Sequence, residues 1–129
     1  MHLTAMVFAI FAALLHVFIF YMESISWTSE KTRSTFGMSE EAAENTKEMA
    51  FNQGFYNLFL AIEVFAGVGL YITGAQGVGL ALMLFGTGSM LAAALLLFIT
   101  SPDKRSAAIK QGALPLIAVI ALILTMVLY

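Results

Sequence analysis

The sequence predicts an all-α protein, a bundle of four transmembrane helices with short loops, in which the second helix extends into the cytoplasm. Of the 129 residues, 60% are hydrophobic and only 11% are charged, whereas soluble domains are about 25% charged. Four apolar segments each approach the roughly 20 residues that a spanning helix needs. We therefore expect a single integral membrane domain over residues 1–129, with spans at about 3–27, 48–72, 78–100 and 108–128.

The first span is expected to continue as a helix beyond the apolar run, through Glu23 to Trp27. A tryptophan at this place suits the membrane–water interface, where its ring is partly apolar and its N–H is polar. Residues 28–38 then read as a polar connection, which Gly37 interrupts, because glycine commonly marks turns and loops.

The second helix is predicted to start at Ser39, a residue type that caps helix N-termini. Glu40 and Glu41 follow in the first turn, where the helix dipole favours negative charge. No breaker interrupts the sequence from there to about Tyr71, which gives a helix roughly 48 Å long at about 1.5 Å per residue. Such a helix is longer than the membrane is thick, so its charged first turns project from the bilayer.

The third span follows the uncharged turn 73–77 and carries many small residues, which let helix backbones approach closely. They are Gly79, Gly86, Gly88, Ser89, Ala92 and Ala93. We expect this Gly- and Ala-rich helix to support a homo-oligomer. The fourth span follows a basic loop, and Pro115 is expected within its first turn, where proline is tolerated.

Charge sets the expected orientation and excludes several functions. All six Lys and Arg residues fall in loops 28–47 and 101–110, so the positive-inside rule makes those loops cytoplasmic and places both termini outside. The expected location is the inner (plasma) membrane, as a multi-pass protein. The absence of cysteine excludes disulfides and thiolate metal sites. The net charge of -2 gives no reason to expect nucleic-acid binding, and no cofactor is predicted.

Polar residues in the first two spans predict an intramembrane site, since such residues are costly in a bilayer and tend to mark function. His16 and Glu23 are seven residues apart, within about 20° of one helix face. On the second helix one stripe comprises Asn45, Glu48, Asn52, Tyr56, Phe59 and Glu63, with Gln53 and Asn57 to one side. Placing the two helices antiparallel predicts a cavity open to the cytoplasm, with these ligand-binding candidates: His16, Glu23, Asn52, Gln53, Tyr56, Asn57 and Glu63.

Several functions fit this cavity. It could bind a small amphipathic or lipid-like molecule, with His16 and Glu63 as candidate catalytic acid and base. Alternatively, an oligomeric carrier could couple a small molecule to protons through the same two residues. A third alternative is a structural or partner-binding protein, in which the amides only join helices by hydrogen bonds. Two carboxylates and a histidine are a weak signal for metal, and no metal site is predicted.

Three stretches carry a resemblance that covers most of the chain, residues 16–27, 36–39 and above all 52–61. In these stretches the sequence resembles a small bacterial membrane family, domain of unknown function 1304 (DUF1304). The matching positions are His16, Glu23, Trp27, Phe36, Gly37, Asn52, Gln53, Gly54, Tyr56, Asn57, Phe59 and Leu60. Glu63 departs from the family pattern, which is apolar there. The resemblance implies a four-helix membrane protein and brings no known activity with it.

A second, architectural likeness is to membrane-associated eicosanoid and glutathione enzymes, which are four-helix proteins of similar size with a polar second helix. Their second helix carries an arginine that Met49 replaces in this sequence. A glutathione thiolate site is therefore not expected, and the likeness bears on architecture alone.

Overall fold

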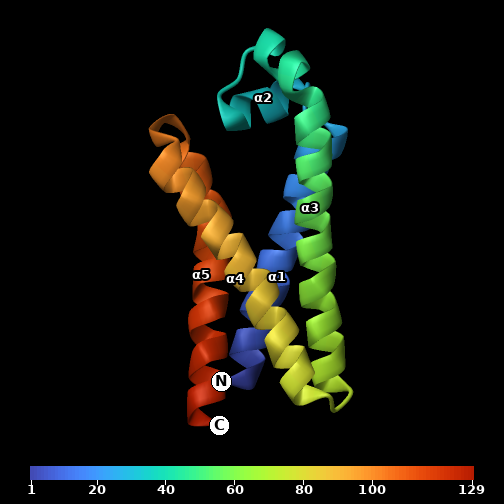
Figure 1. The fold of residues 1–129 in the computed structure, drawn as a ribbon, viewed down its shortest axis with the longest axis vertical. Helices are drawn as coiled ribbons and strands as arrows, with labels where there is room; N and C mark the ends of the chain where they lie inside the picture. Colours follow the sequence, from blue (N-terminus) through green and yellow to red (C-terminus); the bar gives the residue numbers. More distant parts are fainter.

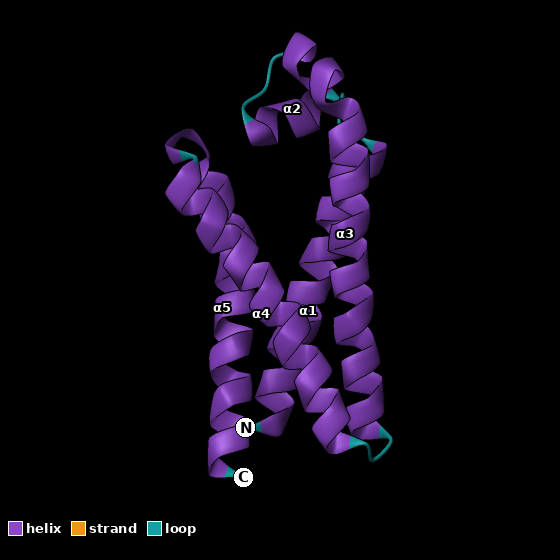
Figure 2. Ribbon diagram, in the orientation of Figure 1, coloured by secondary structure: helices purple, strands orange, loops and turns teal.

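The computed structural model describes residues 1–129, almost all of them helical (Figures 1 and 2). The elements are α1 (His2–Phe20), the π-helical turn η1 (Tyr21–Ile25), α2 (Glu30–Phe36), α3 (Glu40–Ile72), α4 (Gln76–Thr100), the 3₁₀ turn η2 (Pro102–Lys104) and α5 (Arg105–Leu128). Four segments are long and apolar enough to cross a membrane, namely α1 with η1, α3, α4, and η2 with α5. The predicted all-α, four-helix membrane architecture is confirmed.

The two ends of the bundle differ in character. Both termini and the turn between α3 and α4 lie at one end, which we call the terminal end, whereas α2 and the connection between α4 and α5 lie at the other (Figure 1). We call the second end the basic end, because the chain's six Lys and Arg residues belong to its segments: Lys31, Arg33, Lys47, Lys104, Arg105 and Lys110.

Glycines hold α3 and α4 in close contact on the side of the terminal end. A Cβ added to Gly79 would lie 2.6 Å from the carbonyl oxygen of Gly67, and one added to Gly86 would lie 2.5 Å from Cγ2 of Val64. Real side chains do not approach so closely, so only glycine permits this packing. Small residues at helix contacts are the usual way in which membrane helices pack tightly.

Toward the basic end, α4 leaves α3 and packs on α5 instead. A Cβ on Gly112 of α5 would lie 2.9 Å from Cβ of Ala94 on α4. The helices therefore form two pairs at this end, α1 with α3 and α4 with α5, and α2 lies across the end between them (Figure 1). The small residues thus decide where the bundle is tight and where it divides.

Capping residues explain the helix boundaries at the basic end. Ser39 accepts a hydrogen bond from the Ala42 N–H at 3.1 Å, so the predicted N-cap of the second helix is confirmed. Gly37 adopts φ 65°, a left-handed conformation that suits glycine at a helix C-terminus. The connection 28–38 contains an additional helix, α2, because Ser29 caps it by accepting a bond from the Thr32 N–H at 3.2 Å.

Two helix predictions were wrong. The first helix does not continue as an α-helix to Trp27, because it widens into the π-turn η1 and ends at Ser26. Pro115 is not in the first turn of the last helix, since α5 already begins at Arg105. Proline lacks the N–H that would bond the carbonyl four residues earlier, so the Gln111 carbonyl loses its usual helical donor.

The terminal end is joined by an aromatic cluster. The Tyr71 hydroxyl and Nδ1 of His2 form a hydrogen bond, and their rings stack at a centroid distance of 5.8 Å. The Tyr129 ring approaches His2 at 5.1 Å. This cluster links α1, α3 and the C-terminus far from the polar residues of the basic end.

Candidate functional site

Glu23 is the buried carboxylate around which the candidate site is built. It lies in the π-turn η1, and only 8% of it is exposed. Nδ2 of Asn57 on α3 donates a hydrogen bond to Oε1 of Glu23 at 2.5 Å. Asn57 also donates to the Gln53 carbonyl at 3.2 Å, which fixes its amide. Single π-turns inside α-helices are often found at functional sites.

The contact between η1 and α3 depends on Gly54. A Cβ there would lie 2.0 Å from Oγ and 3.0 Å from the backbone nitrogen of Ser24. The Ser24 hydroxyl donates to the Phe51 carbonyl at 2.7 Å across the same contact. Because α3 turns Gly54 toward η1, the neighbouring residues Gln53 and Asn57 are placed on the side of Glu23.

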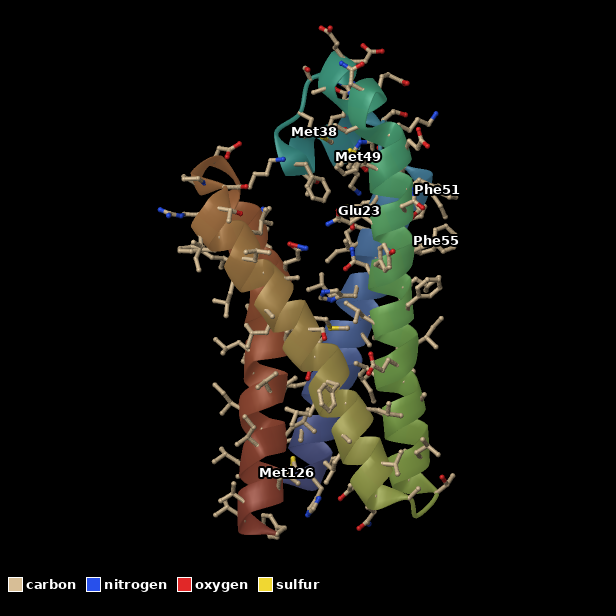
Figure 3. All side chains as sticks on the ribbon, in the orientation of Figure 1. Glu23, Met38, Met49, Phe51, Phe55 and Met126 are labelled. Carbon is tan, nitrogen blue, oxygen red and sulfur yellow. The ribbon has the colours of Figure 1, made fainter.

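A hollow of about 390 Å³ lies between the two helix pairs at the basic end, and we call it the central hollow. Its lining residues are Glu23, Trp27, Phe36, Met38, Ala42, Thr46, Met49, Ala50, Gln53, Leu97, Lys104, Ala107 and Gln111. Glu23, Met38 and Met49 lie on the side of α3 that faces α4, whereas Phe51 and Phe55 project from the opposite side (Figure 3). The hollow is therefore built by η1, α2, α3, α4, η2 and α5 together.

Two aromatic rings form part of its wall. The centroids of Trp27 and Phe36 are 5.1 Å apart, with an interplanar angle of 54°. The Trp27 Nε1–H donates to the Thr46 hydroxyl at 3.1 Å, and Thr46 in turn donates to the Ala42 carbonyl at 2.7 Å. The ring pair is thus held between α2 and the first turns of α3.

A second hollow, the flank hollow, has a volume of about 450 Å³ and shares Glu23 and Trp27 with the first. Its other lining residues are Ser24, Ile25, Thr28, Glu44, Lys47, Glu48 and Phe51. Most of its charges belong to the overhanging first turns of α3, which are exposed. We therefore take the central hollow, with its buried carboxylate and apolar wall, as the candidate site.

The structure brings together only part of the predicted site. Asn57 bonds Glu23, and Gln53 lines the central hollow with Glu23. Asn52 and Tyr56 are exposed, Tyr56 to 69%. Asn52 donates its amide N–H to the Glu48 carbonyl of its own helix at 3.0 Å. The expectation that one stripe faces the first helix was wrong, because Gly54 makes that contact and lies about 200° around α3 from both residues.

His16 and Glu63, the two catalytic candidates, do not join this group. His16 is 2% exposed, and its Nδ1–H donates to the Ala12 carbonyl at 2.8 Å within α1. Glu63 is half-buried on α3. Neither residue lines the central or the flank hollow, so the two do not form an acid–base pair with Glu23 there.

Sequence reasoning missed the far wall of the hollow. Lys104 was expected in the basic loop and Gln111 was not singled out, but α5 already begins at Arg105, and both residues line the central hollow with Glu23. A glutamine seven residues after Lys104, at helical spacing, is the signal that points to a shared face. Phe36 and Met38 were not predicted as site residues, because α2, which brings them to the hollow, was not predicted.

The polar lining of the central hollow comprises one carboxylate, two amide side chains, one hydroxyl and one ammonium, namely Glu23, Gln53, Gln111, Thr46 and Lys104. Groups of these kinds can form hydrogen bonds and ion pairs with a ligand. No group of three or more His, Cys, Asp or Glu side chains in the chain is arranged to hold a metal ion. A buried carboxylate with one hydrogen-bonded oxygen can accept a further donor on the other oxygen.

The sequence matches a protein-family model described as "Protein of unknown function (DUF1304)" over residues 10–123. No curated protein matches the sequence. No solved structure matches the fold.

Proposed function

Since the chain belongs to the DUF1304 family of proteins of unknown function, we propose that it is a membrane protein that binds a small amphipathic or lipid-like molecule in the central hollow. Of the predicted site residues, Glu23 and Gln53 line this hollow, and Asn57 holds the Glu23 carboxylate by a hydrogen bond from outside the lining. The sequence also suggested His16, Asn52, Tyr56 and Glu63 as ligand-binding residues, and their positions leave them outside the central hollow.

The observation that carries the proposal is the position of Glu23. It is buried, its partner Asn57 is neutral, and it lies on the wall of a hollow. Burying a carboxylate is unfavourable unless polar partners compensate for lost water. A structural role alone would be served by a closed, fully paired carboxylate, whereas this one borders open space of about 390 Å³.

The apolar wall supports an amphipathic ligand in particular. Eight of the 13 lining residues are hydrophobic. Met49 lines the hollow and is nevertheless 74% exposed. Methionine side chains adapt to differently shaped apolar partners. A ligand with one polar end and an apolar body would cover this surface and satisfy the polar groups at the same time.

Native mass spectrometry of the gently purified protein tests the proposal. The wild type is expected to carry a bound amphiphile. Gln53→Trp fills part of the hollow and should lose the bound mass, whereas Asn52→Trp, the same change on the neighbouring outward position, should keep it. A wild type without bound mass, or equal retention in both variants, contradicts ligand binding in this hollow.

We also propose that the basic end faces the cytoplasm and that the membrane is the inner (plasma) membrane. The support is the distribution of charge, since the segments of the terminal end contain no Lys or Arg. In this orientation the central hollow lies in the cytoplasmic half of the protein, and both termini lie outside.

Association between copies remains a proposal, with support from the outward face of α4. Gly79 and Gly86 are used within the chain, but nothing lies within 4 Å of a Cβ at Gly88. Gly88, Ser89 and Ala92 line a shallow groove of about 330 Å³ on this helix. Small residues on a lipid-facing helix favour close contact with another helix, and Ala92→Leu should then reduce the oligomeric mass.

The carrier alternative has less support. It requires Glu63 and His16 to act on one substrate, and neither residue lines the central hollow. The structural alternative explains the bond between Asn57 and Glu23 but assigns no role to the hollow or to exposed Met49. Ligand binding is the function that accounts for all three features.

A further inference from the structure

The charges that line the central hollow are one of each sign. Glu23 on η1 is the one carboxylate, and Lys104 on η2 is the one cation among the 13 lining residues. Glu23 is buried, whereas Lys104 is exposed. The hollow therefore offers a buried carboxylate that can pair with a cation and an exposed ammonium that can pair with an anion. The two groups belong to different elements of its wall.

The carboxylate lacks a charged partner in the chain. Its one hydrogen-bond partner is the neutral amide of Asn57, which occupies Oε1. Oε2 is left as the acceptor for a group in the hollow. A buried carboxylate gains most from a partner that brings both a positive charge and N–H donors.

The rings of Trp27 and Phe36 favour the same kind of partner. They line the hollow together with Glu23 and stand at 54° to each other with centroids 5.1 Å apart. Ammonium groups are attracted to aromatic faces, most strongly to tryptophan, and quaternary ammonium ligands are commonly held this way. The bond from Trp27 to Thr46 holds the indole in place for such a contact.

Resting on the proposed function, we propose that the ligand is a zwitterionic amphiphile. Its ammonium group binds Glu23, Trp27 and Phe36, and its anionic group, such as a phosphodiester, binds Lys104. The apolar body then covers Met49 and Leu97 of the same hollow. An amphiphile with only an anionic head could pair with Lys104 but would leave the Glu23 carboxylate without a cationic partner, and is disfavoured.

Trp27 makes the proposal directly testable, because it is the protein's one tryptophan. Its fluorescence is followed in a neutral maltoside detergent during titration with decyl probes below their critical micelle concentrations. The probes differ only in the head: phosphocholine, trimethylammonium or phosphate. Phosphocholine is expected to bind most tightly, trimethylammonium less tightly, and phosphate least.

Variants assign the head groups to residues. Glu23→Gln should weaken decylphosphocholine about tenfold, as expected for the loss of a charge-assisted contact. Glu48→Gln, on the exposed flank hollow, is the matched control and should change nothing. Lys104→Gln should weaken decylphosphocholine while sparing decyltrimethylammonium. Because Lys104 is exposed, this second test stays informative even if Glu23→Gln impairs folding.

The outcomes separate the two proposals. The zwitterion assignment fails if decyl phosphate binds as tightly as decylphosphocholine. It also fails if both Glu23→Gln and Lys104→Gln leave the affinity for decylphosphocholine unchanged. In either case the proposal of amphiphile binding survives. If no probe changes the Trp27 signal and the wild type carries no bound mass, ligand binding fails as well. Phosphocholine without a chain distinguishes a free head group from a lipid: equal affinity would overturn the need for the apolar body.

Discussion

Asn57 and Glu23 are 34 residues apart in the chain, yet Nδ2 of Asn57 lies 2.5 Å from Oε1 of Glu23. This bond joins α3 to the π-turn that ends the first span. It also positions the carboxylate on the wall of the central hollow. The same contact therefore contributes to packing and to the candidate site, and the two contributions can be measured separately.

The bond predicts energetic coupling between the two residues. In a double-mutant cycle, Asn57→Ala and Glu23→Ala are expected to couple by about 0.5–3 kcal/mol, because each single change leaves the other polar group without its partner. Reversible unfolding in detergent gives the free energies. Asn57→Ala combined with Glu48→Ala is the control pair, and the changes in unfolding free energy should be additive. A coupling energy of similar size in the control pair would mean that the coupling of Asn57 and Glu23 is not specific to their hydrogen bond.

Gly54 predicts a packing constraint at the crossing of η1 and α3. Gly54→Ala should destabilise the protein by about 1–3 kcal/mol, the usual cost of overpacking, since its Cβ would lie 2.0 Å from Ser24 Oγ. Gly69→Ala on the same helix meets nothing within 4 Å and should be neutral or stabilising by up to about 1 kcal/mol. Thermal unfolding of the two variants measures both effects. Equal stability of Gly54→Ala and Gly69→Ala would contradict the close approach of η1 and α3 at Gly54.

His16 is predicted to support packing rather than the ligand. His16→Ala should lower the unfolding free energy by about 2–4 kcal/mol, because it removes a buried side chain and leaves a cavity. The affinity of decylphosphocholine should stay unchanged, since His16 does not line the central hollow. His16→Leu, which keeps most of the volume, should recover stability. A loss of affinity in both variants at normal stability would return His16 to the site.

The proposed orientation predicts an accessibility pattern that the sequence makes simple to measure. The chain has no cysteine, so single cysteines report without background. A membrane-impermeant maleimide applied to intact cells should label Ala75→Cys, in the turn at the terminal end. Ser106→Cys, at the start of α5, should react only after the membrane is permeabilised. The reverse pattern would place the basic end outside.

The sequence was sufficient for the architecture because the relevant signals are local. Four apolar segments define the spans, and Ser39 marks the start of α3 through a cap that involves only its own first turn. The whole second helix from Glu40 follows from the absence of any breaker. These features depend on neighbouring residues alone, so periodicity and capping rules capture them.

The rotation of α3 could not be predicted in the same way. Polar residues at helical spacing suggested that Asn52 and Tyr56 face the first helix, but close packing is decided by the smallest residue at the crossing. Gly54 turns toward Ser24, so the amides at 53 and 57 face inward. The π-turn was not predicted either, and its wider turn means that the α-helical spacing used for His16 and Glu23 does not apply between them.

Because the central hollow lies between α3 and α4, its occupancy would depend on the concentration of the ligand in the bilayer rather than in water. Met49 and Leu97 line it from these two spanning helices, and Met49 is exposed, so the proposed amphiphile would enter from the surrounding leaflet. Each methylene adds about 0.8 kcal/mol to partition into the bilayer. A longer chain therefore raises the affinity referred to the aqueous phase, whereas the affinity referred to mole fraction in the bilayer changes little. A site that is weak on the bilayer scale can be filled in a membrane in which its ligand is a major component.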